Sequence, residues 1–259
     1  MKKTSTQKKA ARRGKLMRLI DAVTSPRKSA AAVIVAAGGS TRMGEGVNKQ
    51  FIELRGKPVL ALTVEAFEKT DGIDYIIVVV RAGDEEAVKE LAARYGFKKV
   101  RSVIAGGGTR QESAIRGVEA LDGDTDMVAI HDGARCLVTP EMITAVLETA
   151  KKTGAASAGS PVKDTIKQVS FFNVVENTPD RTKLWAAGTP QIFKAGLYRA
   201  AAYYAEKDGA EVTDDNALLE RLGGKVTMVD CGYTNIKITT PEDVAVAEAL
   251  LRYREENGQ

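Results

Sequence analysis

The chain has 259 residues, of which 44% are hydrophobic and 28% charged, and its formal net charge is +4. These proportions are ordinary for a globular protein, and no apolar run approaches the roughly 20 residues that a membrane-spanning helix needs. A Cys/His zinc site is excluded, because His131 is the single histidine and the two cysteines, Cys136 and Cys231, lie far apart. Two thiols in a chain of this length favour a reducing compartment, so we expect a cytoplasmic protein.

The positive charge is concentrated in residues 1–30, which hold ten Lys or Arg and one acid. The rest of the chain holds 28 bases and 33 acids and is therefore mildly acidic. We expect residues 1–30 to be a basic, disordered extension, because large apolar residues are rare in it. The alternatives are contact with nucleic acid or an anionic membrane, or an organellar targeting peptide, for which KLMRLIDAV is the only hint. A secretory signal is disfavoured because an apolar core is missing.

From Ala31 onward, short β-rich runs alternate with helical patterns. Strands are predicted at AAVIVAA, YIIVVV, VRSVIAG, DMVAI, KVTMVDC and NIKIT. Helices are predicted at PVLALTVEAFEKT, DEEAVKELAARYG, TRQESAIRGVEAL, PEMITAVLETAKKTG, GLYRAAAYYAEKDG, DDNALLERLGG and from Pro241 onward. This alternation predicts an α/β fold, with a mostly parallel sheet flanked by helices on both faces. We treat residues 31–255 as one domain.

Residues 160–187 interrupt this alternation. They contain two β-rich runs, VKDTIKQV and FFNVVENT, joined by a turn near Ser170. A hairpin that protrudes from an α/β body needs another surface to cover its apolar side, because an isolated hairpin is only marginally stable in water. We therefore predict that this segment is an arm that contacts a partner subunit.

A glycine-rich loop with two cations follows the first predicted strand. Gly38, Gly39 and Gly44 let the backbone approach a ligand closely, and exposed N–H groups in such a loop bind oxyanions. Arg42 and Lys49 add full positive charges. Because the loop matches neither GxxxxGK[ST] nor GxGxxG, the usual P-loop and dinucleotide motifs are both disfavoured. A loop at the carboxyl end of a strand in this fold class is a common ligand site.

A second glycine-rich turn, AGGGTRQES, follows the predicted strand VRSVIAG and opens a helix. Gly106, Gly107 and Gly108 leave room for a flat ligand, and Arg110 and Ser113 could donate hydrogen bonds to its edge. Two glycine turns at one sheet edge suit a nucleotide, with one turn for the phosphates and the other for the base. Taken alone, the turn is also typical of a tight connection between a strand and a helix.

The third motif is HDGAR, residues 131–135, at the end of the predicted strand DMVAI. An acid at this position could bind Mg²⁺ or a substrate hydroxyl, so Asp132 is a candidate ligand. Arg135 could bind a second anion. We expect His131 to be a core residue with its hydrogen bonds satisfied. The shorter motifs TPDR, GTPQIF, VTDD and NIKIT each place polar groups at turns or strand ends and are individually weak evidence.

Together, AAGGSTRMG…NKQF, GGGTRQES, HDGAR, VKDTI, TPDR, TPQIF, TDD and NIKITTPED resemble the 2-C-methyl-D-erythritol 4-phosphate cytidylyltransferase family over about residues 31–253. The resemblance implies a Rossmann-like nucleotidyltransferase fold. It implies transfer of CMP from CTP to 2-C-methyl-D-erythritol 4-phosphate, which yields CDP-methylerythritol and pyrophosphate for isoprenoid precursor biosynthesis by the non-mevalonate pathway. It further implies dependence on Mg²⁺ or another divalent cation, and a homodimer in which the arm at 160–187 reaches the partner's active site.

The resemblance also implies roles for individual residues. Catalytic charge stabilisation is implied for Arg42, Lys49 and Lys237. CTP binding is implied for Ala36, Ala37, Gly38, Gly39, Gly107, Gly108, Arg110 and Ser113. Binding of the polyol phosphate is implied for Asp132, Arg135, Thr165, Arg181, Thr189 and Thr213, and the two arm residues, Thr165 and Arg181, are expected to serve the other subunit's site. The metal would be bound by Asp132, or otherwise only through the CTP phosphates. One departure is Cys136, where the family usually has proline, and it predicts a less rigid loop around Arg135.

Elementary chemistry agrees with this interpretation. A phosphomonoester is already an anionic nucleophile at neutral pH, so a general base is not obligatory. The barrier lies in bringing it to a polyphosphate, which a protein lowers by neutralising charge and aligning the two groups.

Three alternatives remain. Ribitol-5-phosphate cytidylyltransferase shares nearly every motif, because its nucleophile is also a polyol phosphate. A sugar-1-phosphate uridylyl- or guanylyltransferase is disfavoured by HDGAR, TPDR and NIK. Nucleic-acid binding through residues 1–30 is a remote possibility, since the rest of the chain carries a net charge of −5 and predicts no basic face.

Overall fold

The computed structural model describes residues 29–39, 41–43 and 48–258. The predicted basic extension falls on residues 1–30 and therefore lies almost entirely outside the described residues. Within the described part of the chain, no helix is both long enough and apolar enough to cross a membrane.

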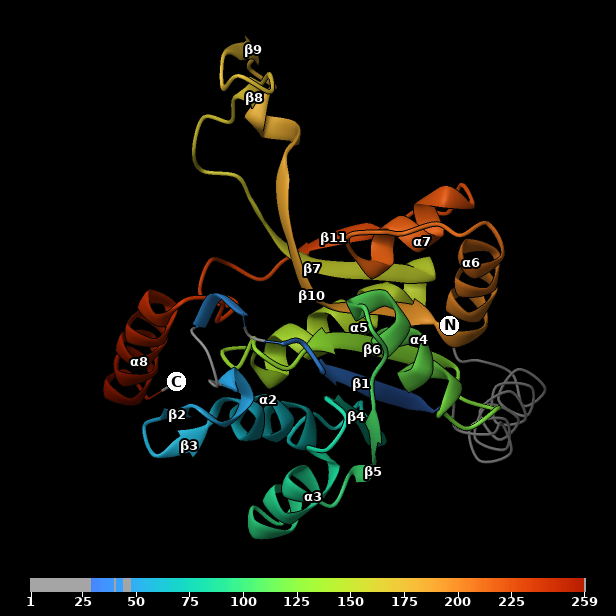
Figure 1. Cartoon of the computed structure of the whole chain (residues 1–259), viewed down its shortest axis with the longest axis vertical. Helices are drawn as coiled ribbons and strands as arrows, with labels where there is room; N and C mark the ends of the chain where they lie inside the picture. The colour runs from blue at the N-terminus through green and yellow to red at the C-terminus, as the bar shows by residue number, and fades with distance from the viewer. Residues whose placement is uncertain (1–28, 40, 44–47, 259) are drawn as a thin grey trace, which may run out of the picture.

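A seven-stranded sheet forms the centre of the structure (Figure 1). Its strand order is β11-β7-β10-β6-β1-β4-β5. In that order the bounds are Thr227–Asp230, Ala155–Pro161, Trp185–Lys194, Met127–Asp132, Ala30–Ala36, Tyr75–Val80 and Val100–Ala105. β10 runs antiparallel to both of its neighbours, and the other strand pairs are parallel. The predicted α/β fold with a mostly parallel sheet is confirmed.

Helices cover both faces of the sheet. Their bounds are Val59–Glu68 for α2, Glu85–Arg94 for α3, Arg110–Glu119 for α4, Pro140–Thr153 for α5, Ala195–Lys207 for α6, Asp215–Arg221 for α7 and Pro241–Glu256 for α8. Side chains alternate along β1, so Ile34 packs with α2 and α5 on one face while Val33 packs with α4 and α6 on the other. Burial on both faces explains why the central strands are nearly continuous Val, Ile and Ala.

Short elements connect the larger ones. The 3-10 helices are η1 (Thr41–Met43), η2 (Lys49–Phe51) and η3 (Arg181–Lys183), and a small ribbon pairs β2 (Glu53–Leu54) with β3 (Lys57–Pro58). A third apolar cluster joins this ribbon to α8 and includes Cys136, which is only 4% exposed. Cys136 is thus packed in this cluster, and the less rigid loop around Arg135 stays a prediction.

The segment between β7 and β10 projects from the body of the molecule (Figure 1). It contains β8 (Gln168–Val169) and β9 (Val175–Asn177), which pair antiparallel. The turn between them is close to the predicted position, because the N–H of Ser170 donates to the carbonyl of Val174 at 2.9 Å. The paired strands are much shorter than the sequence predicts. A contact with a partner subunit stays a prediction.

One predicted strand is wrong. Residues 235–239, NIKIT, form no strand. Instead, the N–H of Ile238 donates to the carbonyl of Ala134 at 2.8 Å, and the Ile238 side chain is fully buried in the cluster around α8. The β-branched side chains that predicted a strand are thus buried by packing against a loop and a helix, and this packing places Lys237 beside the end of β6.

Candidate active site

A cavity of about 290 Å³ opens at the carboxyl ends of β1, β5 and β6. This is the edge where open α/β sheets bind ligands. The loops after these strands supply most of its lining, and Lys237 and Thr239 come from the extended segment before α8. The predicted site residues that line it are Ala37, Gly38, Gly39, Arg42, Lys49, Gly107, Gly108, Arg110, Ser113, Asp132 and Lys237.

The first wall carries two of the predicted cations. Arg42 is exposed and Lys49 is half-buried at the start of η2. The preceding residue, Asn48, caps η2 by accepting from the N–H of Gln50 at 3.2 Å, and its amide donates to Asp84 at 2.8 Å, which ties the loop to the start of α3. Burial lowers the pKa of Lys49, and the neighbouring charges of Lys237 and Arg42 lower it further. The site thus concentrates positive charge before any ligand is bound.

The second wall is the glycine turn before α4. The N–H of Gly107 donates to Ser113 Oγ at 3.1 Å, and this hydroxyl donates to the carbonyl of Thr109 at 2.8 Å. A Cβ on Gly106 would lie 2.5 Å from the Cβ of Ala37, so the turn needs glycine to pass this close to the loop after β1. These contacts of Ser113 shape the turn from inside, while its side chain still borders the cavity.

Asp132 lies at the centre of a cluster of cations. Its Oδ1 accepts from Arg110 Nε at 2.9 Å, and its Oδ2 is 2.8 Å from Lys237 Nζ and 3.6 Å from Arg135 Nε. Burial alone would raise the pKa of Asp132, but Arg110 and Lys237 outweigh it and hold the pKa well below its usual value. The carboxylate therefore stays ionised and fixes three cations around the cavity.

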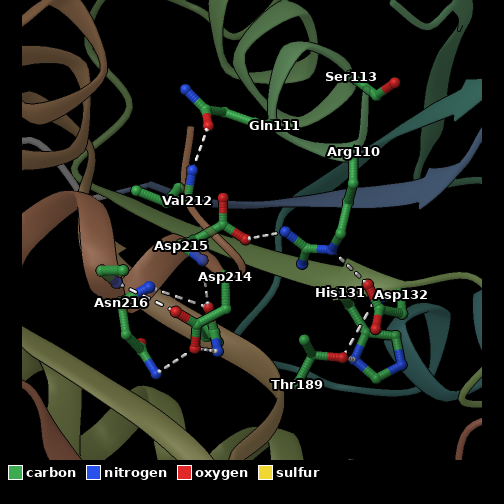
Figure 2. A network of polar contacts seen from close by, with 12 residues as sticks. Arg110, Gln111, Ser113, His131, Asp132, Thr189, Val212, Asp214, Asp215 and Asn216 are labelled. Carbon is green, nitrogen blue, oxygen red and sulfur yellow. Dashed lines mark hydrogen bonds and ion pairs between the residues drawn. The ribbon is translucent and has the colours of Figure 1, made fainter. Parts of the chain in front are cut away.

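Arg110 is held between two carboxylates, as Figure 2 shows. Its Nη1 donates to Asp215 Oδ2 at 2.7 Å, and Tyr198 donates to the other oxygen of Asp215 at 2.8 Å. Burial opposes the charge of Arg110, yet Asp215 and Asp132 raise its pKa above the ordinary value. Gln191 accepts from the backbone N–H of Asp215 at 2.9 Å and so connects the first residue of α7 to β10. The guanidinium is thereby fixed in orientation before a ligand arrives.

The sequence prediction did not assign Asp215 or Gln191 to the site. Both belong to motifs it quoted, VTDD and GTPQIF, but their contacts join α4, α7 and β10, which are far apart in the chain. Gln50, Thr109 and Thr239 also line the cavity and were not predicted. The available signal was the pair of acids at the start of a helix, where one acid, Asp214, is the N-cap and accepts from the N–H of Ala217 at 3.1 Å.

Other predicted residues lie outside the cavity lining. Ala36 is buried at the end of β1, and Thr213 is exposed before α7. Arg135 reaches Asp132 but lines a neighbouring cavity of about 210 Å³, where its Nη1 donates to the carbonyl of Asn235 at 2.9 Å. Thr189 is buried against the backbone of Asp132. The arm residues Thr165 and Arg181 are exposed, and the structure does not bring them to the cavity of their own chain.

The described residues do not form a metal site by themselves. No group of three or more His, Cys, Asp or Glu side chains among them is arranged to bind a metal ion. Asp132 is the one acid among the described residues that line the cavity, and both of its oxygens are already paired with cations. A divalent cation needs several oxygen ligands, and the described residues do not supply them at this cavity.

Comparisons with known proteins agree with this geometry. The family model for 2-C-methyl-D-erythritol 4-phosphate cytidylyltransferase matches residues 30–253. Proteins of that name from Desulforamulus reducens and Halalkalibacterium halodurans are 45% and 47% identical, each over 86% of this chain and over 96% and 97% of their own lengths.

Solved structures of the same kind of enzyme are also similar. The structure of 4-diphosphocytidyl-2C-methyl-D-erythritol synthase from Anaerococcus prevotii has a TM-score of 0.78 at 33% identity, covering 87% of this chain and 96% of its own. The cytidylyltransferase from Thermus thermophilus has a TM-score of 0.71 at 32% identity, covering 85% of this chain and 98% of its own. The chain therefore belongs to the 2-C-methyl-D-erythritol 4-phosphate cytidylyltransferase family.

Proposed function

We propose that this protein transfers CMP from CTP to 2-C-methyl-D-erythritol 4-phosphate, forming CDP-methylerythritol and pyrophosphate. The observation that carries the proposal is the convergence of Arg42, Lys49 and Lys237 on one cavity that two glycine turns border. Such a site suits a triphosphate on one side and a flat base on the other. Membership of the cytidylyltransferase family names the nucleotide and the polyol phosphate.

In the proposed reaction, a phosphate oxygen of methylerythritol phosphate attacks the α-phosphorus of CTP. A new P–O bond forms, the bond between the α-phosphorus and the bridging oxygen of the β-phosphate breaks, and pyrophosphate leaves with its electron pair. No proton has to be removed from the nucleophile, because the phosphomonoester is already anionic. The protein's task is therefore to align two anions and to neutralise the charge between them.

Arg42, Lys49 and Lys237 supply that neutralisation. Lys49 and Arg42 come from the loop after β1, and Lys237 comes from the segment before α8, where Asp132 holds its ammonium at 2.8 Å. Each such cation in a partly dry site should stabilise the transition state by on the order of 3 kcal/mol, comparable with an oxyanion-hole donor. Asp132 itself is a poor general base, because its depressed pKa favours the ionised form that keeps Lys237 and Arg110 in place.

We further propose that the divalent cation enters as the counter-ion of CTP. The described residues offer one carboxylate at the cavity, and both of its oxygens are paired with cations, so the triphosphate oxygens would provide the main ligands. Mg²⁺ then belongs to the substrate, and Asp132 acts through the cations that it orients. Chelation would remove activity without unfolding the protein.

The proposed active assembly is a homodimer. Its support is the projecting segment between β7 and β10, where Phe171 and Phe172 are 95% and 82% exposed. Exposed aromatic side chains in a monomer are expected where a partner covers them. Thr165 and Arg181 lie on the same segment and do not line the cavity of their own chain. We propose that they contribute to the active site of the other subunit. A cytoplasmic location is proposed on the two buried, unbridged cysteines.

Pyrophosphate release from the purified protein tests the proposed function. Methylerythritol phosphate and ribitol 5-phosphate are offered separately with CTP and Mg²⁺, and ATP, GTP and UTP serve as nucleotide controls. We expect rapid turnover only with CTP and methylerythritol phosphate, and a loss of at least about 100-fold in Lys49→Ala. Preference for ribitol 5-phosphate would keep the mechanism and overturn the proposed substrate, and absence of turnover with both polyols would overturn the function.

A further inference from the structure

The histidine at the end of β6 connects two segments of the site. The ring of His131 is completely buried. Its Nε2 lies 3.1 Å from the carbonyl oxygen of Arg135, and its Nδ1 lies 3.0 Å from Thr189 Oγ1. The same hydroxyl accepts from the N–H of Asp132 at 3.1 Å. Figure 2 shows His131, Asp132 and Thr189 together, with Arg110 on the other side of the carboxylate.

These contacts determine where the hydrogens lie. A carbonyl oxygen can only accept, so Nε2 of His131 must carry the ring proton that reaches Arg135. Burial lowers the pKa of His131 to about 3, which keeps the ring neutral and leaves Nδ1 as an acceptor. The hydroxyl of Thr189 therefore donates to Nδ1 and accepts from the N–H of Asp132. Its single hydrogen points into the protein and away from the cavity.

We propose that His131 is a positioning residue for the polyol-phosphate side of the site, acting through the hydroxyl of Thr189 and the carbonyl of Arg135. The inference rests on the proposed function and extends it. His131 spans the turn from Asp132 to Arg135, in which the N–H of Arg135 donates to the carbonyl of Asp132 at 3.0 Å. By fixing both ends of this turn, the ring sets the path of the backbone from which Arg135 would reach the second substrate. Thr189 then acts as part of the support and does not donate to the phosphate.

A purely structural role would be the simpler explanation, because the ring also packs against Phe67 with centroids 5.0 Å apart. The two roles predict different kinetics. Loss of packing lowers stability without selecting a substrate. Loss of the Nε2 contact moves the Arg135 end of the turn and weakens binding of the polyol phosphate. CTP is spared, because Arg110 and Lys237 still hold the carboxylate of Asp132. A variant that removes both hydrogen bonds, His131→Leu, separates these outcomes, with Phe67→Leu as the matched control for packing.

We expect His131→Leu to raise the KM for methylerythritol phosphate about tenfold, with the KM for CTP unchanged within about twofold, because small displacements of positioned groups are costly. Phe67→Leu should lower the melting temperature and leave both KM values near those of the wild type. Two further variants keep one hydrogen bond each: His131→Asn replaces the Nδ1 acceptor with its amide oxygen, and His131→Gln replaces the Nε2 donor with its amide nitrogen. Each should have a KM for methylerythritol phosphate between those of His131→Leu and the wild type. Equal increases of the two KM values, or an unchanged KM for the polyol phosphate, would overturn the proposal.

A double-mutant cycle tests the role of Thr189. If Thr189 acts through His131, then Thr189→Val and His131→Leu remove the same connection. The KM for methylerythritol phosphate in the double variant should then be no higher than in the more impaired single variant. If Thr189 donated to the phosphate directly, the two losses would multiply. Multiplied losses would overturn the assignment of Thr189 as support.

A readout without substrates keeps the inference separate from the proposed function. His131 is the single histidine of the chain, so ¹⁵N-histidine labelling of the untagged protein gives one imidazole spectrum. We expect a neutral ring with its proton on Nε2, and an altered Nδ1 resonance in Thr189→Val. A proton on Nδ1, or no response to Thr189→Val, would overturn the inference whatever the enzyme turns over. A wild-type enzyme without cytidylyltransferase activity would instead refute the proposed function.

Discussion

Lys49 is the residue at which function and stability are opposed. It is half-buried, and burial and the nearby Lys237 and Arg42 lower its pKa. In the unfolded chain this amine titrates near the ordinary lysine value of 10.5. The protein therefore keeps a charge where the charge is unfavourable for folding, a pattern expected of a site that binds an anion.

Replacement of this amine tests that opposition. Lys49→Met should reduce kcat/KM by at least about 100-fold, because a cation at the transferred phosphate is lost. The same change should raise the melting temperature, because a charge that is repelled in the folded state is removed. Calorimetry and steady-state kinetics on the same preparations measure both effects. A less stable, inactive variant would show that Lys49 has mainly a structural role.

The pH dependence follows from the same shift. Because the folded pKa of Lys49 is lower than the unfolded one, the unfolded state holds the proton to higher pH, so this group's contribution to stability increases as the pH rises through the folded pKa. Activity changes in the opposite direction, since binding of CTP needs the ammonium. We expect kcat/KM for CTP to fall on the alkaline side below pH 10.5, the ordinary lysine value, and the fall to be absent in Lys49→Arg. The same alkaline limb in both enzymes would assign it to another group.

At the residue scale, the sequence could predict those site residues that belong to a short motif next to a predicted strand. Arg42, Lys49 and the glycines follow strands directly, so their convergence at one sheet edge could be inferred from topology. Asp132 was predicted as a ligand, and the structure shows that three cations surround it. Such pairing depends on contacts between elements far apart in the chain, which periodicity does not report.

Among the elements, α4 is the one whose position matters most for the site, because it begins with Arg110 and contains Ser113. It lies very close to the sheet at Gly117. A Cβ there would overlap Val33 Cγ1 and lie 2.9 Å from Val79 Cγ2. The helical pattern predicted this element well, but not its close approach, which depends on β1 and β4. The wrong strand at 235–239 has a related cause, since tertiary packing buried its β-branched side chains without a neighbouring strand.

Gly117→Ala should therefore destabilise the protein by about 1–3 kcal/mol, the usual cost of overpacking a core. The matched control is Gly196→Ala in α6, where a Cβ meets nothing within 4 Å, and alanine should there be neutral or stabilising by up to about 1 kcal/mol. Urea denaturation measures both. Equal effects of the two substitutions would show that backbone propensity, and not the approach of α4 to the sheet, decides the result.

At the scale of the whole molecule, the body encloses the cavity and the segment between β7 and β10 extends away from it (Figure 1). Sequence predicted this segment from its break in the strand–helix alternation. It could not predict how little of the segment is paired, because β8 and β9 comprise only Gln168–Val169 and Val175–Asn177. Its exposed apolar side chains leave the proposed homodimer as the arrangement to test.

Substitution of the exposed aromatic pair tests the homodimer. Phe171→Ser with Phe172→Ser should shift the protein from dimer to monomer and reduce turnover by at least about tenfold, because Thr165 and Arg181 would no longer be supplied to the partner. The matched control is Tyr203→Ser with Tyr204→Ser on α6, an aromatic pair that is 60% and 48% exposed. Sedimentation equilibrium measures the mass. A monomeric, fully active wild type would contradict the proposed role of the arm.

The central claim is that the α-phosphate of CTP is transferred to methylerythritol phosphate in the cavity that contains Lys49. The most direct measurement is ³¹P NMR of the complete reaction, with CTP, Mg²⁺ and methylerythritol phosphate present together. We expect pyrophosphate and CDP-methylerythritol to appear in equal amounts, each by its own diphosphate resonances, and neither to appear with Lys49→Met. Formation of CMP in place of the diphosphate product, or no reaction of CTP with methylerythritol phosphate, would contradict it.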